Sequence, residues 1–171
     1  MPQNSRKSSE KKFQSNAREL AVSSMQMSCS NEPEDLLKPS GNLVMQIITM
    51  PDQRYKAYCN GTDFIQKYIF PGGHLPSVVK ILDVTTKHTK LNLLHMEEFT
   101  EHYAKTLNIW HENFMQKLDE VKKLGFDEYF IRMWKMYLSY CEAAFLTRNI
   151  NLVQVVFSRY QNTALNQGLV A

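Results

Sequence analysis

Three stretches of the chain carry the apolar pattern of buried strands. Residues 43–50 read LVMQIITM, an almost continuous run of apolar and β-branched residues. Such a run is typical of a strand covered on both faces, as in a parallel α/β sheet. Residues 152–158 (LVQVVFS) show the same pattern, and residues 91–96 (LNLLHM) form a shorter candidate. We therefore predict three strands, with room for helices between them.

Two long helices are predicted between the second and third strands. The first has an apolar stripe at helical spacing, formed by Phe99, Tyr103, Leu107, Trp110, Phe114, Leu118 and Val121. Gly125 is its expected end, and Asp127 is the expected N-cap of the next helix. The stripe of that helix is Phe130, Ile131, Trp134, Leu138, Cys141 and Phe145. With a short helix expected over residues 77–87, the order of elements indicates an α/β fold.

An aromatic helical stretch follows the first strand. Residues 53–70 look helical, with a break at Asn60-Gly61 and with Thr62 or Asp63 as the N-cap of the second piece. One side of that piece carries Phe64, Ile65, Tyr68 and Ile69. Pro71-Gly72-Gly73 ends it, because proline lacks a donor and glycine opens positive φ. This apolar side must be covered either by the protein core or by an apolar ligand.

Composition divides the chain into three parts. Residues 1–35 are rich in Ser, Lys, Gln and Asn, so we expect a disordered segment. A transit peptide is the alternative, but the acidic residues and the preference for Lys over Arg weigh against it. The first 30 residues hold five basic and two acidic residues, and the remainder holds fifteen of each. The part of the chain after residue 30 is therefore neutral overall, which argues against nucleic acid as a partner. We expect the folded domain over residues 36–160 and a polar tail over 161–171.

The cysteines and histidines exclude several kinds of site. Cys29, Cys59 and Cys141 lie far apart without a CxxC pair, which fits a reducing, cytoplasmic compartment rather than a disulfide framework. The five histidines form neither HxxxH nor HExxH, so we expect no metal site. No apolar run approaches the roughly 18 residues of a spanning helix, and the N-terminus lacks the apolar region of a secretory signal.

Three residues have both a structural and a chemical interpretation. Tyr103 lies on a helical stripe and, on that pattern alone, is a core tyrosine. Cys141 lies on the next stripe, where a cysteine behaves as a small hydrophobic residue. Gln46 interrupts an apolar strand, and a buried amide needs partners either in the backbone or in a ligand.

Several motifs together resemble one enzyme family. They are residues 48–55 (ITMPDQRY), residues 64–77 (FIQKYIFPGGHLPS) and the spaced set Glu97, His102-Tyr103, Thr106-Leu107 and Trp110. These segments resemble the cyclopropane-fatty-acyl-phospholipid synthases, including mycolic acid cyclopropane synthase-like enzymes. Such enzymes use S-adenosylmethionine to modify unsaturated acyl chains of phospholipids. The resemblance covers residues 36–160 and implies the C-terminal part of a Rossmann-like methyltransferase fold, with inserted helices over the acyl pocket.

The resemblance implies roles for particular residues. In these enzymes the alkene attacks the sulfonium methyl group, and a base then removes a proton from the carbocation in a dry pocket. The implied catalytic residues are Tyr103 and Cys141, and the implied bicarbonate-binding residues are Gln46, Ile48 and Tyr103. The implied acyl-substrate-binding residues are Phe64, Tyr68, Phe70, Pro71 and Gly73. Thr100 departs from the family, which commonly has glycine there.

The cofactor half of such an enzyme has no counterpart in the sequence. An S-adenosylmethionine site in this fold needs a glycine-rich turn after the first strand, and none of the six glycines forms one. We therefore expect S-adenosylmethionine and bicarbonate to be the family's cofactors but not to be bound by this chain alone, which we expect to be inactive. Residues 43–50 would then form an open apolar edge.

Three functional hypotheses follow. The first is the acyl-binding half of such an enzyme, peripheral to a membrane, where phospholipid acyl chains are its partners. It acts with a complementary N-terminal half or as a homo-oligomer. The second is a non-enzymatic lipid- or partner-binding remnant, and the third is a non-functional fragment.

Overall fold

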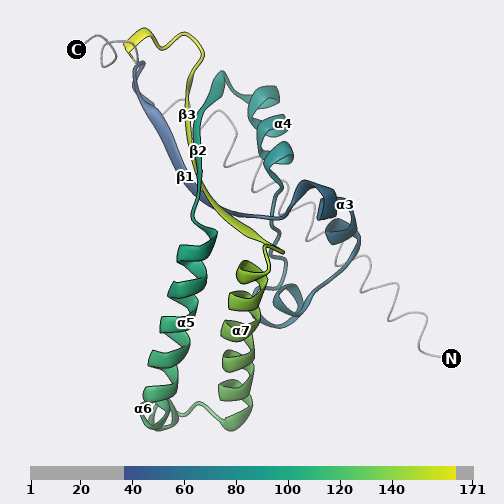
Figure 1. The fold of residues 1–171 in the computed structure, drawn as a ribbon, viewed down its shortest axis with the longest axis vertical. Coiled ribbons are helices and arrows are strands. Elements are labelled where there is room, and N and C mark those ends of the chain that lie inside the picture. Colours follow the sequence, from purple (N-terminus) through teal and green to yellow (C-terminus); the bar gives the residue numbers. More distant parts are fainter. Residues whose placement is uncertain (1–36, 165–171) are drawn as a thin grey trace, which may run out of the picture.

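The computed structural model describes residues 37–164, which fold into a three-stranded sheet with a short helix on one side and a long helical hairpin at one end (Figure 1). The expected disordered segment 1–35 and tail residues 165–171 lie outside the described part. The elements in order are β1 (Asn42–Thr49), α3 (Asp52–Asn60), the π-helical turn η1 (Ile65–Ile69), α4 (Val78–His88), β2 (Leu91–Glu98), α5 (Thr100–Gln116), α6 (Leu118–Lys123), α7 (Glu128–Leu146) and β3 (Asn151–Arg159). This order agrees with the α/β fold predicted from the apolar pattern.

The last strand of the chain, β3, is the central strand of the sheet. β1 and β2 flank β3, and both pair antiparallel with it. The expectation of a strand covered on both faces in a parallel sheet is therefore wrong for residues 43–50. Within the described part, β1 is an edge strand, and Val44 is 63% exposed. An apolar run does not specify which strands pair with it. In this structure no helix covers most of one face of β1.

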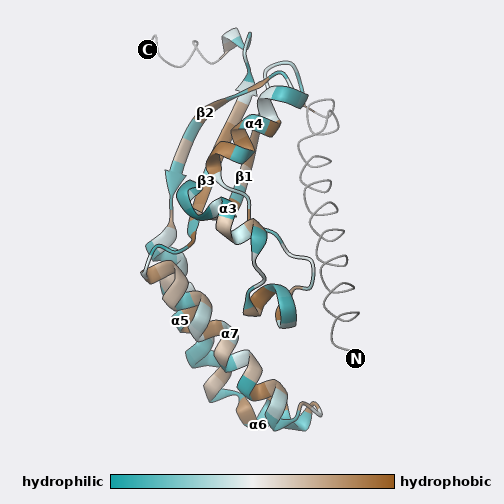
Figure 2. Ribbon diagram, turned by 90° about the vertical axis from the view of Figure 1, so that its right-hand side faces the viewer, coloured by the Kyte–Doolittle hydropathy of each residue, from teal (hydrophilic) through white to brown (hydrophobic). Residues whose placement is uncertain are grey.

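Alternate residues of β3 supply two separate cores, because successive side chains of a strand point to opposite faces. Val153, Val155 and Phe157 pack with Ile81 of α4 and Leu91 of β2 on one face. On the other face Leu152 packs against the α5–α7 hairpin, in a core of Ala104, Leu107, Leu138 and Phe145. The hydropathy colouring shows the apolar strip of α4 turned toward the sheet (Figure 2).

The helical hairpin follows the predicted stripes with one difference. The expected single helix from Phe99 to Val121 ends at Gln116, and α6 begins at Leu118. The predicted stop and cap are confirmed. Gly125 has a φ of 91°, which glycine adopts without strain, and the Phe130 amide donates to the Asp127 carboxylate at 2.8 Å. No described helix is long and apolar enough to cross a membrane.

The loop between α3 and α4 is held by side-chain hydrogen bonds. The predicted break at Asn60-Gly61 is present. Asp63 caps the next turn, because its carboxylate accepts from the backbone N–H of Gln66 at 2.8 Å. The Gln66 side chain donates to the Tyr58 hydroxyl at 3.0 Å and to the Gly73 carbonyl at 3.1 Å. This loop closes over the junction between the sheet and the hairpin.

Candidate functional site

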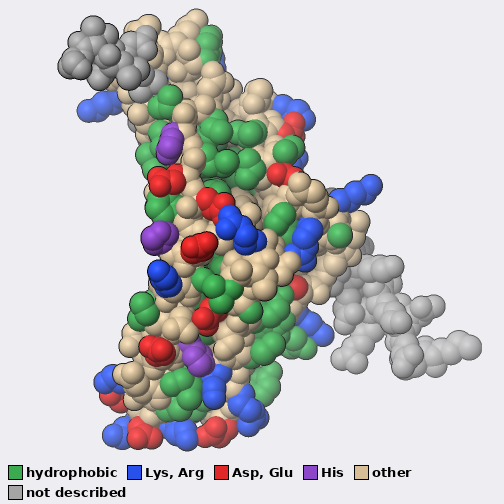
Figure 3. All heavy atoms as spheres, viewed as in Figure 1, with side chains coloured by type: hydrophobic (Ala, Val, Ile, Leu, Met, Phe, Trp, Pro, Cys, Tyr) green, Lys and Arg blue, Asp and Glu red, His purple; other side chains and the backbone are tan. Residues whose placement is uncertain are grey.

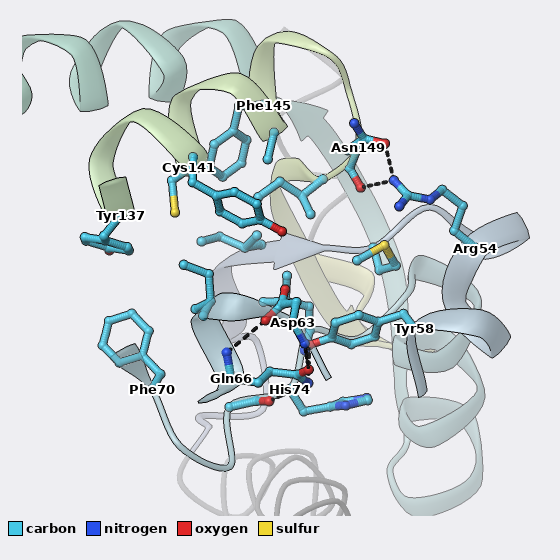
Figure 4. A pocket seen from close by; sticks show the side chains of 18 of the residues that line it. Arg54, Tyr58, Asp63, Gln66, Phe70, His74, Tyr137, Cys141, Phe145 and Asn149 are labelled. Carbon is cyan, nitrogen blue, oxygen red and sulfur yellow. Dashed lines mark hydrogen bonds between the residues drawn. The ribbon is translucent and has the colours of Figure 1, made fainter. Parts of the chain in front are cut away.

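A pocket of about 410 Å³ lies where the end of β1 meets the hairpin and the α3–α4 loop (Figure 4). Its volume falls within the range of small-molecule sites, which run from about 300 to 1,000 Å³. Its apolar and aromatic lining includes Ile48, Met50, Ile65, Phe70, Leu75, Leu107, Tyr103, Tyr137, Tyr140, Cys141, Ala144, Phe145 and Ile150. The polar side chains of the lining are Arg54, Tyr58, Asp63, Gln66, His74 and Asn149. A mostly apolar lining with a minority of polar groups is the usual composition of a site for a largely apolar ligand.

The two ends of the pocket differ in chemistry. Phe70 and Tyr137 lie together at one end, with ring centroids 6.0 Å apart. At the other end the Arg54 guanidinium donates to both the backbone carbonyl and the side-chain oxygen of Asn149 (Figure 4). The pocket therefore has an aromatic end and a polar end.

The floor of the pocket is built by hydrogen bonds within the α3–α4 loop. The Leu75 amide donates to the Tyr58 hydroxyl at 3.0 Å, and Gln66 donates to the same hydroxyl. His74 lies beside them, with its Nε2 atom 3.0 Å from the Tyr55 hydroxyl. Because these contacts join residues up to 19 positions apart, they fix the loop over the cavity.

The thiol of Cys141 is held in its neutral form. Burial, followed by the negative charge of Asp63, raises the pKa of Cys141 to about 11. At neutral pH the thiolate fraction is then roughly one in ten thousand, and the thiolate is the nucleophilic form. As the structure has it, Cys141 adds apolar surface to the pocket rather than a reactive anion.

Tyr103 is positioned by ring contacts within the hairpin. Its ring meets Phe145 at 5.0 Å and Trp110 at 6.1 Å, both edge to face. Burial, and then proximity to Cys141, raises the pKa of the Tyr103 hydroxyl, which is therefore protonated at neutral pH. No other described residue forms a hydrogen bond with this hydroxyl, so it can donate to a ligand.

The structure brings some of the predicted site residues together and separates others. The pocket lining includes Ile48, Phe70, Gly73, Tyr103 and Cys141. It does not include Gln46, Phe64, Tyr68 or Pro71. The roles assigned to all nine residues stay predictions.

Three of the residues outside the lining have other partners, among them Tyr68, whose ring centroid lies 5.5 Å from that of Phe64. Gln46 lies opposite Gln154 of β3, whose side-chain amide donates to the Gln46 oxygen at 3.1 Å. Phe64 packs against Tyr140 with ring centroids 6.0 Å apart, so it supports the pocket wall from behind. Tyr68 is 48% exposed.

Sequence reasoning missed the polar residues of the pocket. Arg54, Tyr58, Asp63, His74 and Asn149 come from α3, from the loop after it and from the α7–β3 turn. Arg54 and His74 lie within the quoted motifs 48–55 and 64–77 but received no role from them, and only the fold brings the five residues together. In residues 37–164 no group of three or more His, Cys, Asp or Glu side chains is arranged to hold a metal ion.

Comparison with known proteins finds relatives in one family. The tuberculostearic acid methyltransferase UfaA1 of Mycobacterium tuberculosis is 46% identical over 121 residues, which is 71% of this chain and 28% of that protein. The cyclopropane-fatty-acyl-phospholipid synthase of Escherichia coli K12 is 38% identical over 123 residues, 72% of this chain and 30% of that protein. The chain thus spans less than a third of either relative.

Solved structures share the fold. The mycolic acid cyclopropane synthase CmaA1, crystallised with SAH and CTAB, matches 78% of this chain and 49% of its own chain, with a TM-score of 0.68 and 22% identity. The cyclopropane synthase MmaA2 of Mycobacterium tuberculosis matches the same share with a TM-score of 0.67 and 22% identity.

Residues 25–155 match the family described as mycolic acid cyclopropane synthetase, so the match covers most of the described fold and all of the pocket. The two relatives named above are similar to this chain in sequence, and CmaA1 is similar to it in fold. This chain belongs to the mycolic acid cyclopropane synthetase family of S-adenosylmethionine-dependent methyltransferases.

Proposed function

We propose that the pocket binds an unsaturated acyl chain of a membrane phospholipid. These residues would then form the acyl side of an enzyme that transfers a methyl or methylene group from S-adenosylmethionine to the double bond. The observation that carries the proposal is the apolar pocket itself, which lies within the part of the chain that matches the family. An apolar chain gains free energy by leaving water for such a cavity.

Tyr103 is proposed to hold an anion beside the bound chain. Its hydroxyl is protonated, lines the pocket and has no acceptor among the described residues, which fits a small anion such as bicarbonate. Bicarbonate, when bound, would supply a base for the proton that the substrate loses. Ile48 also lines the pocket, whereas Gln46 would have to leave Gln154 before it reached such an ion.

Cys141 is proposed to contact the acyl chain without forming a bond to it. Its thiol is neutral near pH 7, because burial and Asp63 raise its pKa. A neutral thiol packs as a small apolar group against an alkyl chain.

The described residues do not fit S-adenosylmethionine. A site for it in this fold needs a glycine-rich turn that leads from a strand into a helix, so that backbone amides approach the ligand closely. None of the described glycines lies between one of the three strands and the helix that follows it. We therefore assign no step of the methyl transfer to these residues and propose that they do not catalyse it alone.

A lipid-binding module without catalysis is the second candidate. It is supported by the apolar lining of the pocket, which residues of this chain supply. Both candidates require the pocket to bind an acyl chain, and they differ only in whether a complementary chain restores activity.

Two alanines on α7 offer a matched test of acyl binding. Ala144 lines the pocket, whereas its neighbour Ala143 is exposed on the same helix and lies outside the lining. We expect Ala144→Phe to fill the cavity and weaken binding of a monounsaturated lysophospholipid by about tenfold or more, a loss of roughly 1.4 kcal/mol. Ala143→Phe should bind like the parent chain.

Isothermal titration calorimetry below the critical micelle concentration measures these affinities. Thermal unfolding of both variants controls for overpacking, which costs about 1–3 kcal/mol in a tight core. Equal affinity of all three proteins, or no binding by the parent chain, would overturn the proposed function.

A further inference from the structure

Four aromatic side chains form a continuous row that begins before α7 and continues along one face of that helix, which we call the aromatic ladder: Phe126, Phe130, Trp134 and Tyr137. Their successive ring centroids are 4.3, 5.7 and 4.9 Å apart. Steps of four and three residues keep Phe130, Trp134 and Tyr137 on one face of α7, and Cys141 continues this face four residues further on. Since Tyr137 and Cys141 line the pocket, the ladder leads directly into it.

We propose that the aromatic ladder binds the methyl-terminal part of the acyl chain whose double bond lies beside Tyr103 and Cys141. This inference rests on the proposed function, because it assigns a further segment of the same ligand to a further surface. It extends the binding site from the pocket to the tip of the hairpin.

The ladder is partly open to solvent and carries no charge. Phe126 is 44% exposed, and Phe130 and Trp134 are only partly buried. The space-filling view shows hydrophobic side chains along the α7 edge of the hairpin, below the α3–α4 loop (Figure 3). Uncharged aromatic faces offer alkyl groups contact area but offer a lipid headgroup no ionic partner.

The length of the ladder suits an acyl chain. Eleven residues separate Cys141 from Phe130, which is about 16 Å along the helix axis at 1.5 Å per residue. One leaflet of a bilayer is half of the roughly 30 Å hydrocarbon core, so its acyl chains span about 15 Å. The segment beyond the double bond is shorter than this whole-chain span, so the ladder is long enough to hold it to its methyl end.

The polarity of the pocket sets the direction of the bound chain. Phe70 and Tyr137 lie at the end that leads to the ladder, and Arg54 with Asn149 lies at the opposite end (Figure 4). Burying a polar headgroup at the aromatic end would leave its polar atoms without hydrogen-bond partners, which costs free energy. We therefore place the headgroup side toward Arg54 and the methyl end on the ladder.

Trp134 reports directly on this arrangement. Trp110→Phe leaves Trp134 as the one tryptophan of the full chain, since the sequence has two. Stearic acids with a doxyl nitroxide near either the methyl end or the carboxylate then serve as quenchers of its fluorescence. The electron paramagnetic resonance spectrum of each nitroxide reports the bound fraction independently of quenching.

At equal bound fraction, we expect the methyl-end label to quench Trp134 at least about twofold more than the carboxylate-end label, because quenching requires proximity. Equal quenching, or stronger quenching by the carboxylate-end label, would overturn the inference while leaving acyl binding intact. A mobile nitroxide signal with both labels, meaning no binding, would instead overturn the proposed function.

A pair of substitutions in the parent chain gives a second, independent test. Phe130 belongs to the ladder, whereas its neighbour Tyr129 is 60% exposed and lies off it. We expect Phe130→Ser to weaken binding of a long monounsaturated fatty acid by about three- to tenfold relative to a short one, and Tyr129→Ser to change neither. Equal effects of both variants would overturn the inference. The inference would also be overturned if a second copy of the chain covered the ladder. In that case the molecular mass in solution would rise with protein concentration, and Phe130→Ser would abolish the rise.

Discussion

The two faces of the sheet pack in different ways. On the α4 face, aliphatic residues and Phe157 close a core that excludes solvent, and Phe157 is 0% exposed. On the hairpin face, the buried core of Leu107, Leu138 and Phe145 is continued by a pocket with aromatic and polar groups. β3 supplies side chains to both faces, so one strand supports a sealed core and a cavity at once.

This difference indicates where stability and binding reside. A close-packed aliphatic core stabilises the fold, because every atom has neighbours and no polar group is left without a partner. The pocket face leaves a cavity and raises the pKa values of Tyr103 and Cys141 through burial. We therefore expect substitutions on the α4 face to change the free energy of unfolding, and substitutions around the pocket to change ligand affinity.

The largest effect is expected from Phe157→Ala on the sealed face. Removing a fully buried phenyl ring at the centre of the sheet leaves a cavity that costs about 3–5 kcal/mol in the free energy of unfolding. Urea unfolding followed by circular dichroism measures this loss. The acyl affinity of the molecules that remain folded should be unchanged, and a loss below about 1 kcal/mol would mean that the sealed core is not the main source of stability.

The next largest effect concerns the alkylation of Cys141 by iodoacetamide in a Cys29→Ser, Cys59→Ser background. Because the thiolate reacts and its pKa is about 11, the rate should rise with pH toward that value. Near pH 7 it should be at least about tenfold below that of an ordinary thiol, whose pKa is about 8.5. The same shift makes the folded state lose stability as pH rises from about 8.5 through 11, because the unfolded state releases the proton first. A plateau reached near pH 8 would contradict the assignment of a buried neutral thiol.

A smaller effect is expected from Gln66→Leu, which removes three side-chain hydrogen bonds: those that Gln66 donates to Tyr58 and Gly73 and the one that it accepts from the Asp63 backbone amide. Each lost hydrogen bond costs about 1 kcal/mol, so the loop over the pocket should open more often. Hydrogen exchange of residues 61–75 should become faster, while exchange in β3 stays the same. The neighbouring exposed Lys67→Leu is the control, and equal exchange in both variants would show that Gln66 does not hold the loop.

The smallest effect is expected from Phe70→Ala at the aromatic end of the pocket. Phe70 is 54% exposed, so its truncation should cost little unfolding free energy. Loss of its contact with a bound chain should weaken lipid affinity by about three- to fivefold. Calorimetric titration beside thermal unfolding separates the two quantities. A large drop in stability without a change in affinity would place Phe70 in the core and not in the site.

The sequence predicted the elements well and their partners poorly. The stripes of α5 and α7, the Asp127 cap and the Gly125 stop depend on local spacing, so they follow from the pattern alone. The antiparallel pairing and edge position of β1 depend on which strand lies beside it, and an apolar run carries no such information.

The same limit applies to the site. Ile48, Phe70, Tyr103 and Cys141 were named from motifs, and all four line the pocket. The Arg54–Asn149 contact joins residues 95 positions apart, so no local pattern predicts it. The pattern left Gln46 with partners either in the backbone or in a ligand, and in the structure its side-chain oxygen accepts from Gln154 of the neighbouring strand. The bicarbonate role that the resemblance implies for Gln46 stays a prediction.

The central claim is that this chain holds an acyl-binding pocket but no site for S-adenosylmethionine. Thermal unfolding of the full chain, alone, with S-adenosylmethionine and with monounsaturated phosphatidylglycerol vesicles, tests it most directly. A ligand that binds only the folded state raises the midpoint. We predict that the vesicles raise the midpoint and that S-adenosylmethionine leaves it unchanged. A midpoint that rises with S-adenosylmethionine, or one that stays constant with the vesicles, would contradict the claim.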